Sequence, residues 1–233
     1  MVNILLADDN TNFLNNLFKY IIRGNKKLRV VDITTDGIST YNSILELKPD
    51  IVILDLKMPK MNGIEILEKI QKHNATSKII ILSGYNDYIE RIVDNKNIAL
   101  KISKTKDFHT ILKYVNVLAD ELEYDNREKE VSKTLKKISF NMNSIGSKYL
   151  IKAIMIALDD EKLLNRMENN LYSIIAKQFN TTNQNVKWNI NRSIKSMWRY
   201  TDNKKYVSEV FGKNEINCPT AKDIISTSID IFK

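Results

Sequence analysis

The first half of the chain alternates short apolar runs with longer segments in which apolar residues recur every three or four positions. The short runs predict strands at residues 2–6, 28–33, 51–54, 78–82 and 98–102. The longer segments have the spacing of amphipathic helices. Because the second, third and fourth runs are nearly continuous in apolar residues, we expect parallel strands covered on both faces. The alternation predicts an α/β domain with a doubly wound, five-stranded parallel sheet.

The pattern changes after Leu122. Residues 121–133 are almost all charged or polar, and only helical spacings follow. We therefore predict a first domain at residues 1–122, a helical or extended linker at 123–134, and an all-α domain at 135–233. Helices of this second domain are expected at residues 135–142, 145–158, 171–179, 183–198, 206–211 and 221–232.

Composition excludes several classes of protein. The single Cys218 excludes an internal disulfide framework and a multi-cysteine zinc site. The longest apolar runs stop well short of the about 20 residues that span a bilayer. Asp8 and Asp9 directly follow the first apolar run, which is therefore not expected to be a signal peptide. We expect a cytoplasmic protein that does not bind membranes.

Positive charge is concentrated in the second half. Residues 1–124 hold 17 basic and 16 acidic side chains, whereas residues 125–233 hold 19 and 12, a net charge of +7. Within residues 177–205, seven basic residues face one acidic residue. A compact basic segment is typical of nucleic-acid binding. A solvated basic helix face gives the same pattern, and charge alone does not choose between the two.

Polar groups follow four of the five predicted strands, and in a doubly wound sheet such groups collect at one edge. Three carboxylates at one edge repel one another unless a divalent cation lies among them, and Mg²⁺ suits such hard oxygen ligands. A carboxylate beside the ion can attack a phosphoryl group, whose charge a lysine ammonium and a hydroxyl stabilise. An aspartate pair after one strand is more often a helix N-cap, so the combination carries the prediction. The candidates are Asp8, Asp9, Asp55 and the backbone carbonyl of Lys57 for the metal, with Ser83 and Lys104 for the phosphoryl group.

The motifs LLADDN at 5–10, ILDLKMPKMNG at 53–63 and ILSG at 81–84, with the lysine at 104, resemble the receiver domain of bacterial two-component response regulators. The resemblance covers roughly residues 1–122 and implies a flavodoxin-like fold. It also implies that Asp55 is the phosphoacceptor, Asp8 and Asp9 are Mg²⁺ ligands, Ser83 is the switch hydroxyl and Lys104 binds the phosphoryl group. A histidine kinase or phosphotransferase is the implied donor.

Two positions depart from the receiver pattern. The family usually has proline where this chain has Thr105, and an aromatic residue where it has Lys101. Lys101 is an alternative phosphoryl-binding lysine, although the spacing to Asp107 favours Lys104. Because the replaced residues help to couple phosphorylation to the face of the fourth helix, fifth strand and fifth helix, we expect weak phosphorylation-driven dimerisation, or DNA binding without phosphate.

Residues 171–198 read as helix, tight turn and helix. In the second helix, one apolar stripe is formed by Val186, Ile190, Ile194 and Met197 or Trp198. The opposite face carries amide and cationic side chains, which major-groove recognition requires, although an ordinary helix pair has the same pattern. The candidate DNA contacts are Thr182, Gln184, Lys187, Trp188, Asn191, Arg192 and Lys195.

The stretches GSKYLIKAI at 146–154, LDDEKLL at 158–164 and IAKQFNTT at 175–182 resemble the DNA-binding domain of the sporulation stage-zero A regulators, over roughly 135–230. The resemblance implies about six helices that bind double-stranded DNA as a dimer or tandem pair, with RNA polymerase as a candidate partner. These regulators present an acid and two arginines where this chain has Lys187, Trp188 and Asn191. We therefore expect altered or relaxed site preference.

Together these features predict a phosphorylation-controlled, DNA-binding transcriptional regulator of a two-component or phosphorelay system, linked to sporulation or related developmental control, and not an enzyme. One alternative is a receiver that acts through protein–protein interaction after its second domain has lost DNA binding. Another is an enzyme that uses the acidic site on an external substrate, but no further acid–base residue or glycine-rich loop accompanies that site.

Overall fold

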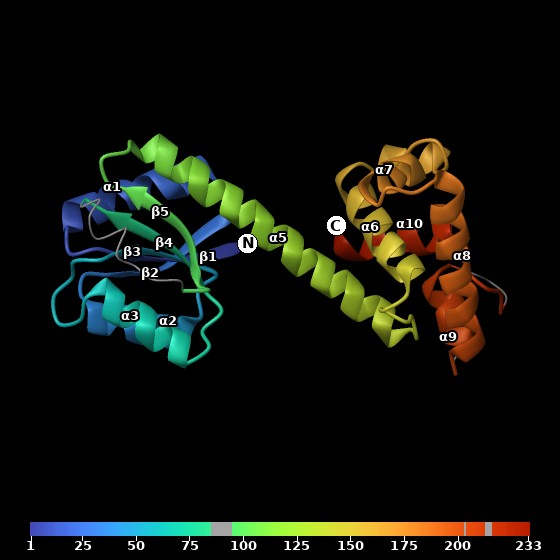
Figure 1. Ribbon diagram of the computed structural model, residues 1–233, viewed down its shortest axis with the longest axis horizontal. Coiled ribbons are helices and arrows are strands. Elements are labelled where there is room, and N and C mark those ends of the chain that lie inside the picture. The colour runs from blue at the N-terminus through green and yellow to red at the C-terminus, as the bar shows by residue number, and fades with distance from the viewer. Residues whose placement is uncertain (85–94, 203, 213–215) are drawn as a thin grey trace. The chain divides into compact units, whose positions relative to one another are not determined.

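The computed structural model describes residues 1–84, 95–202, 204–212 and 216–233. The chain divides into two compact units, Met1–Tyr124 and Asp125–Lys233 (Figure 1). Within the described ranges, every helix is either too short or too polar to cross a membrane. Each unit has its own apolar interior, so each is described by itself.

The first unit is built on a five-stranded parallel sheet with the order β2-β1-β3-β4-β5. This is the flavodoxin-like order, so the predicted fold is confirmed. Each strand begins at the predicted residue and ends one residue later, because the residue after each apolar run still pairs with the neighbouring strand. The strands are β1 (Val2–Ala7), β2 (Leu28–Thr34), β3 (Ile51–Asp55), β4 (Lys78–Ser83) and β5 (Ile98–Ser103).

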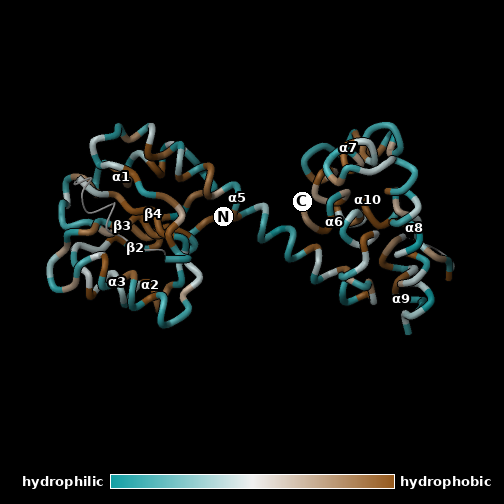
Figure 2. The backbone as a smooth tube through the Cα atoms, viewed as in Figure 1, coloured by the Kyte–Doolittle hydropathy of each residue, from teal (hydrophilic) through white to brown (hydrophobic). Residues whose placement is uncertain are grey.

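Helices cover both faces of this sheet, as Figure 1 shows. The helices α1 (Thr11–Gly24) and α5 (Phe108–Lys137) pack on one face, where Leu17 and Val115 join the core. The helices α2 (Gly37–Leu47) and α3 (Gly63–Lys72) pack on the other face around Ile44, Ile66 and Ile70. The hydrophobic colour in Figure 2 is correspondingly concentrated along the strands between the two helix layers. Both faces are therefore buried, which explains the continuous apolar runs.

The helix α5 makes the predicted linker helical, which was one of its two expected forms, and corrects the helix predicted at 135–142. It runs without a break through the predicted linker at 123–134 and ends at Lys137, so no separate helix spans 135–142. Glu, Lys and Arg are good helix formers, and a charged segment is therefore compatible with helix as well as with a loop. Val131 and Leu135 are buried, which gives the end of the helix an apolar contact in the second unit. The chain leaves the helix at Ser139, whose φ of 72° is left-handed.

In the described residues of the second unit, all regular elements are helical, as predicted. Helix α6 packs against both α8 and α10. Leu150 and Ile154 of α6 are fully buried, as are Ile175 of α7 and Ile190 of α8. The elements are α6 (Ile145–Asp159), the 3-10 helix η1 (Glu161–Arg166), α7 (Leu171–Gln178), α8 (Asn183–Tyr200), α9 (Lys204–Val210) and α10 (Ala221–Phe232).

Asp36 caps α2 and gives a pH-dependent prediction. The backbone N–H of Ser39 and the ammonium of Lys60 bond to its carboxylate, each at 3.0 Å, and hold its pKa at about 2 instead of 3.8. Because the folded pKa is the lower one, this contribution to stability is complete above pH 3.8 and is lost as the pH falls through about 2. Asparagine can also cap the helix but does not titrate. We therefore expect Asp36→Asn to reduce the fall in unfolding free energy, measured by chemical denaturation, as the pH decreases from 3.8 to about 2. The same fall in the variant as in the wild type would contradict this assignment.

Candidate functional site

Three carboxylates meet at the carboxyl edge of the sheet. Asp8 follows β1 and Asp55 ends β3, its neighbour in the sheet, so the strand pairing brings them together. One carboxylate oxygen from each of Asp8, Asp9 and Asp55 lies within 4.8 Å of the other two. Asp8 is 2% exposed and Asp55 is 5% exposed, whereas Asp9 is open to solvent. The predicted cluster is therefore formed, with its outer member accessible.

Lys104 joins two of these carboxylates. Its Nζ lies 2.7 Å from Oδ2 of Asp8 and 2.7 Å from Oδ2 of Asp55. Its backbone N–H donates to the carbonyl of Ser83 at 2.9 Å, which continues the pairing of β5 with β4 and fixes the start of the side chain. Burial would lower the pKa of Lys104, but its hydrogen bonds to Asp55 and Asp8 raise that pKa above its ordinary value. The ammonium therefore remains charged in the site.

The donor set suits a divalent cation. Burial raises the pKa of Asp8 above its ordinary value, and the hydrogen bonds from Lys104 and from the backbone of Asn10 offset only part of that effect. The three carboxylates of Asp8, Asp9 and Asp55 face the single ammonium of Lys104, so the cluster retains excess negative charge. Mg²⁺ prefers oxygen ligands, and a cluster of carboxylates with excess negative charge provides them, so these residues fit the ion.

The segment after Asp55 is shaped by close backbone approach. The N–H of Leu56 donates to Oδ1 of Asp55 at 2.8 Å, and the N–H of Gly63 donates to the carbonyl of Leu56 at 2.9 Å. A Cβ on Gly63 would lie 2.6 Å from the carbonyl oxygen of Asp55, so glycine permits α3 to begin here. Lys57 is exposed and lies with Asp9 in the lining of an adjacent cavity of about 470 Å³. The cavity provides open space beside the acidic cluster.

Ser83 ends β4 and is 1% exposed, and it is paired with Ser103 in the ladder. Lys101 and Thr105 are exposed, and the hydroxyls of Thr105 and Ser103 lie 2.8 Å apart. The lysine that bonds to the carboxylates is thus Lys104, which the spacing favoured. The fourth helix of the expected dimerising face would fall in residues 85–94, which lie outside the described residues.

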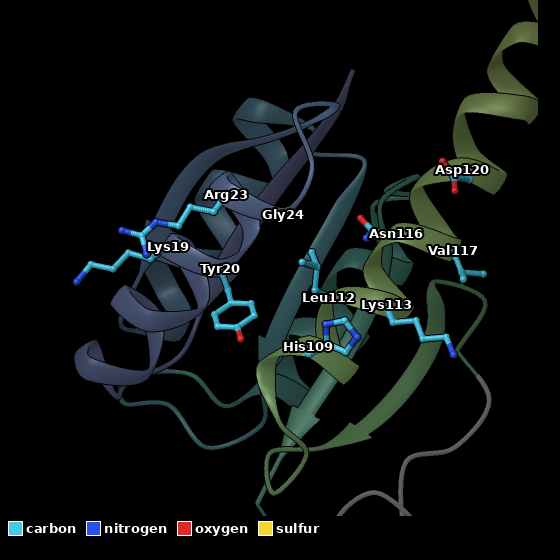
Figure 3. A pocket seen from close by; sticks show the side chains of 10 residues that line it. All are labelled: Lys19, Tyr20, Arg23, Gly24, His109, Leu112, Lys113, Asn116, Val117 and Asp120. Carbon is cyan, nitrogen blue, oxygen red and sulfur yellow. The ribbon is translucent and has the colours of Figure 1, made fainter.

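A larger cavity of about 660 Å³ lies between α1 and α5. Figure 3 shows Tyr20, His109 and Leu112 between the two helices, whereas Lys19 and Arg23 extend away from α5. The sequence did not predict this cavity. Because its polar groups do not converge on one point in the view, the acidic cluster is the better candidate for chemistry.

The predicted helix–turn–helix is present in the second unit. The helix α7 ends at Gln178, the turn passes through Asn180 with a left-handed φ of 49°, and α8 begins at Asn183. Thr182 caps α8, because its hydroxyl accepts the N–H of Asn185 at 3.2 Å. The predicted apolar stripe is buried: Val186, Ile190, Ile194 and Met197 are each at most 3% exposed.

The other side of α8 is open to solvent and basic. Trp188 is 59% exposed, and the guanidinium of Arg192 lies 5.1 Å from the centre of its ring. Lys187 forms an ion pair with Glu168, which was not predicted from the sequence. The two residues are 19 positions apart, and nothing in the sequence around Glu168 indicates that it meets α8. The remaining predicted DNA contacts are exposed or half-buried: Thr182, Gln184, Asn191 and Lys195.

Comparison with known proteins gives one family match within each of the two compact units, and the boundary between the units lies in the gap between the matches. Residues 4–116 match the family described as response regulator receiver domain, and residues 131–232 match the family described as sporulation initiation factor Spo0A C terminal. The receiver match contains the acidic cluster and Lys104. The Spo0A match contains the whole helix–turn–helix.

Solved structures similar to this chain cover about half of it. A DNA-binding response regulator of the LuxR family from Staphylococcus aureus is 24% identical, with 51% of this chain and 98% of that chain covered and a TM-score of 0.48. The REC domain of AraT, a response regulator from Geobacillus stearothermophilus, is 20% identical, with coverage of 54% and 98% and a TM-score of 0.47. The response regulator domain of CheB from Thermotoga maritima is 26% identical, with coverage of 52% and 95% and a TM-score of 0.43.

The two family matches, in this order along one chain, account for both units of the structure. A receiver domain places the second domain under the control of phosphorylation, and the second domain is the DNA-binding domain of a sporulation regulator. The chain therefore belongs to the response regulators, as a phosphorylation-controlled transcription regulator with a receiver domain and a Spo0A-type C-terminal domain.

Proposed function

We propose that Asp55 of the receiver, residues 1–122, accepts a phosphoryl group in a Mg²⁺-dependent reaction, and that α8 of the second domain, residues 135–233, reads DNA. The observation that carries the first part is the Lys104 ammonium, bonded at 2.7 Å both to Asp8 and to Asp55 at the edge of the sheet. This arrangement puts a nucleophile and a cation side by side in a buried site, beside an open cavity that a phosphodonor can enter.

In this reaction a carboxylate oxygen of Asp55 attacks the phosphorus of the donor. A phosphorus–oxygen bond forms, and the bond from phosphorus to the imidazole nitrogen or acyl oxygen of the donor breaks, so that the leaving group departs with its electron pair. Lys104 and the hydroxyl of Ser83 donate hydrogen bonds to the phosphoryl oxygens. Mg²⁺ would be held by Asp8, Asp9, Asp55 and the carbonyl of Lys57, and it would supply positive charge that stabilises the transferring phosphoryl group.

Intact-mass measurement with a small acyl phosphate tests this proposal. We expect a gain of one phosphoryl group in the presence of Mg²⁺ and no gain when a chelator removes the ion. Donation by a histidine kinase or a phosphotransferase should give the same product. Labelling that is unaffected by the chelator would contradict the assignment of the acidic cluster. Repeated release of phosphate from an ester substrate would favour an enzyme.

For the second domain, we infer that the exposed side of α8 enters the major groove. Arg192 and Lys195 are exposed cations that can bind phosphates. The ammonium of Lys187 can donate to the O6 and N7 of guanine, whereas the amide of Asn191 can donate to N7 of adenine and accept from its N6 amine. Binding as a dimer or tandem pair, contact with RNA polymerase and a cytoplasmic location are consistent with this function and belong to the same proposal.

Substitutions on α8 should separate sequence preference from affinity. We expect Lys187→Ala and Asn191→Ala to change the preferred bases, because a lost bidentate base contact costs about 1–3 kcal/mol of discrimination. Arg192→Ala should instead weaken all sequences about equally and reduce the slope of log affinity against log salt by about one. Selection of bound sequences from random DNA, followed by salt titration, measures both effects. If the wild-type chain binds no DNA at any salt concentration, the protein–protein alternative is the better one.

A further inference from the structure

An acidic residue lies against the predicted DNA-reading helix at two points. The carboxylate of Glu168 pairs with the ammonium of Lys187, and the backbone carbonyl of Glu168 accepts a hydrogen bond from the side-chain amide of Asn183 at 2.9 Å. Glu168 lies in the segment between η1 and α7, so it belongs to neither helix of the helix–turn–helix. The second contact fixes its backbone at the first residue of α8.

The Glu168 carboxylate interacts electrostatically with Tyr172 on α7 as well as with Lys187 on α8. Burial and the Glu168 carboxylate together raise the pKa of Tyr172 on α7 to about 12. The side chains of Glu168 and Lys187 are 61% and 48% exposed, so the pair is open to solvent and to a ligand. Exposed pairs of this kind stabilise the fold little, and an incoming phosphate or base can therefore compete for the lysine.

We propose that Glu168 is a specificity-determining residue for the DNA binding proposed above, because it holds the ammonium of Lys187 and limits the contacts that this lysine makes. A lysine ammonium has three N–H donors. One donor is used by Glu168, and this bond restricts the position of the ammonium. From that position the other two donors can bond to a guanine edge while the ion pair with Glu168 remains intact. The inference rests on the proposed function of α8.

The same pair should weaken binding to sequences that lack such a base. While the charge of Lys187 is balanced by Glu168, the lysine does not neutralise a phosphate and releases no counterion from DNA. The carboxylate of Glu168 also repels the phosphates. If Lys187 leaves Glu168 to reach a phosphate, an unpaired carboxylate remains beside the backbone of the DNA. Glu168 therefore lowers the affinity for all sequences, and it lowers it least where Lys187 meets its base.

The test is a double-mutant cycle with Glu168→Gln, Lys187→Ala and the double variant. Fluorescence anisotropy is measured on the duplex that the wild type selects and on a scrambled duplex, each over a range of salt concentrations. We expect Glu168→Gln to raise the affinity for the scrambled duplex about three- to tenfold and to reduce the preference for the selected duplex. The slope of log affinity against log salt concentration should become steeper by about one, because about one more counterion is released. In the Lys187→Ala background, Glu168→Gln should have a much smaller effect.

Glu161→Gln is the matched control. Glu161 forms an exposed ion pair with Lys233 in the same unit, and its side chain is 60% exposed, which is close to the value for Glu168. Its substitution should leave the sequence preference unchanged. Thermal unfolding followed by circular dichroism checks that all variants are folded.

Two results would overturn the inference while the proposed function stands. The first is an equal effect of Glu168→Gln with and without Lys187, which would indicate general charge repulsion. The second is an unchanged preference for the selected duplex. Failure of the wild-type chain itself to bind DNA would instead refute the proposed function of α8, and the inference with it.

Discussion

Asp55→Asn is expected to abolish phosphorylation, with labelling reduced by at least about 100-fold, because an amide is not a nucleophile for this reaction. The substitution preserves size and leaves the second ion pair of the site, between Lys104 and Asp8, in place. It also removes one of three clustered carboxylates, so the folded state should survive. Phosphate-affinity electrophoresis after incubation with an acyl phosphate and Mg²⁺ measures the effect.

Asp32→Asn is a suitable control for this experiment. Asp32 is a partly buried carboxylate in β2 of the same unit, and it accepts hydrogen bonds from the hydroxyl of Ser43 at 2.6 Å and from the N–H of Ile33 at 2.8 Å. The control should label as the wild type does. Labelling of Asp55→Asn at the wild-type level would show that another residue is the acceptor, and peptide mapping would then identify it.

Gly146→Ala is expected to destabilise the second unit. A Cβ at this position of α6 would lie 2.0 Å from the backbone oxygen of Asn189 and 2.3 Å from Oγ of Ser193, both on α8. The backbone oxygen cannot turn aside as a side chain does, so α8 itself must shift. Overpacking of this kind costs about 1–3 kcal/mol and occasionally more. Chemical denaturation should show this loss, together with weaker DNA binding, because α8 is the helix displaced.

Gly24→Ala provides the comparison. Its Cβ would lie 2.3 Å from Cδ2 of Leu112, which is the end of a flexible side chain beside the cavity between α1 and α5. Leu112 can move into that cavity, so we expect only a small change in the free energy of unfolding. A loss for Gly146→Ala no larger than that for Gly24→Ala would contradict the close backbone approach of α6 and α8.

The strands and the acidic cluster were predictable from sequence for the same physical reason. A strand buried on both faces gives an uninterrupted apolar run, and polar residues directly after such runs must lie at one edge of a parallel sheet. Asp8, Asp55 and Lys104 therefore meet as expected, although Asp55 proved to be the last residue of its strand.

The continuity of helix α5 up to Lys137 and the pairing of Lys187 with Glu168 could not be predicted from the sequence. Residues 123–134 carry no apolar pattern that separates an exposed helix from a linker, and burial of Val131 and Leu135 depends on packing in the second unit. The contact between Glu168 and Lys187 likewise depends on how the segment before α7 folds against α8. Such contacts follow from tertiary structure, and no local spacing encodes them.

The additional residue at the end of each strand has an entropic consequence. Asp55 and Ser83 are held in the ladder, where Asp55 pairs with Leu82 and Ser83 pairs with Ser103. The conformational entropy of their backbones is thus lost when the sheet folds, and little remains to be lost when a phosphodonor arrives. Residues supplied by a mobile loop would incur that cost at each encounter. Weakened pairing of β3 with β4 should accordingly slow phosphoryl transfer even where every side chain of the site is unchanged.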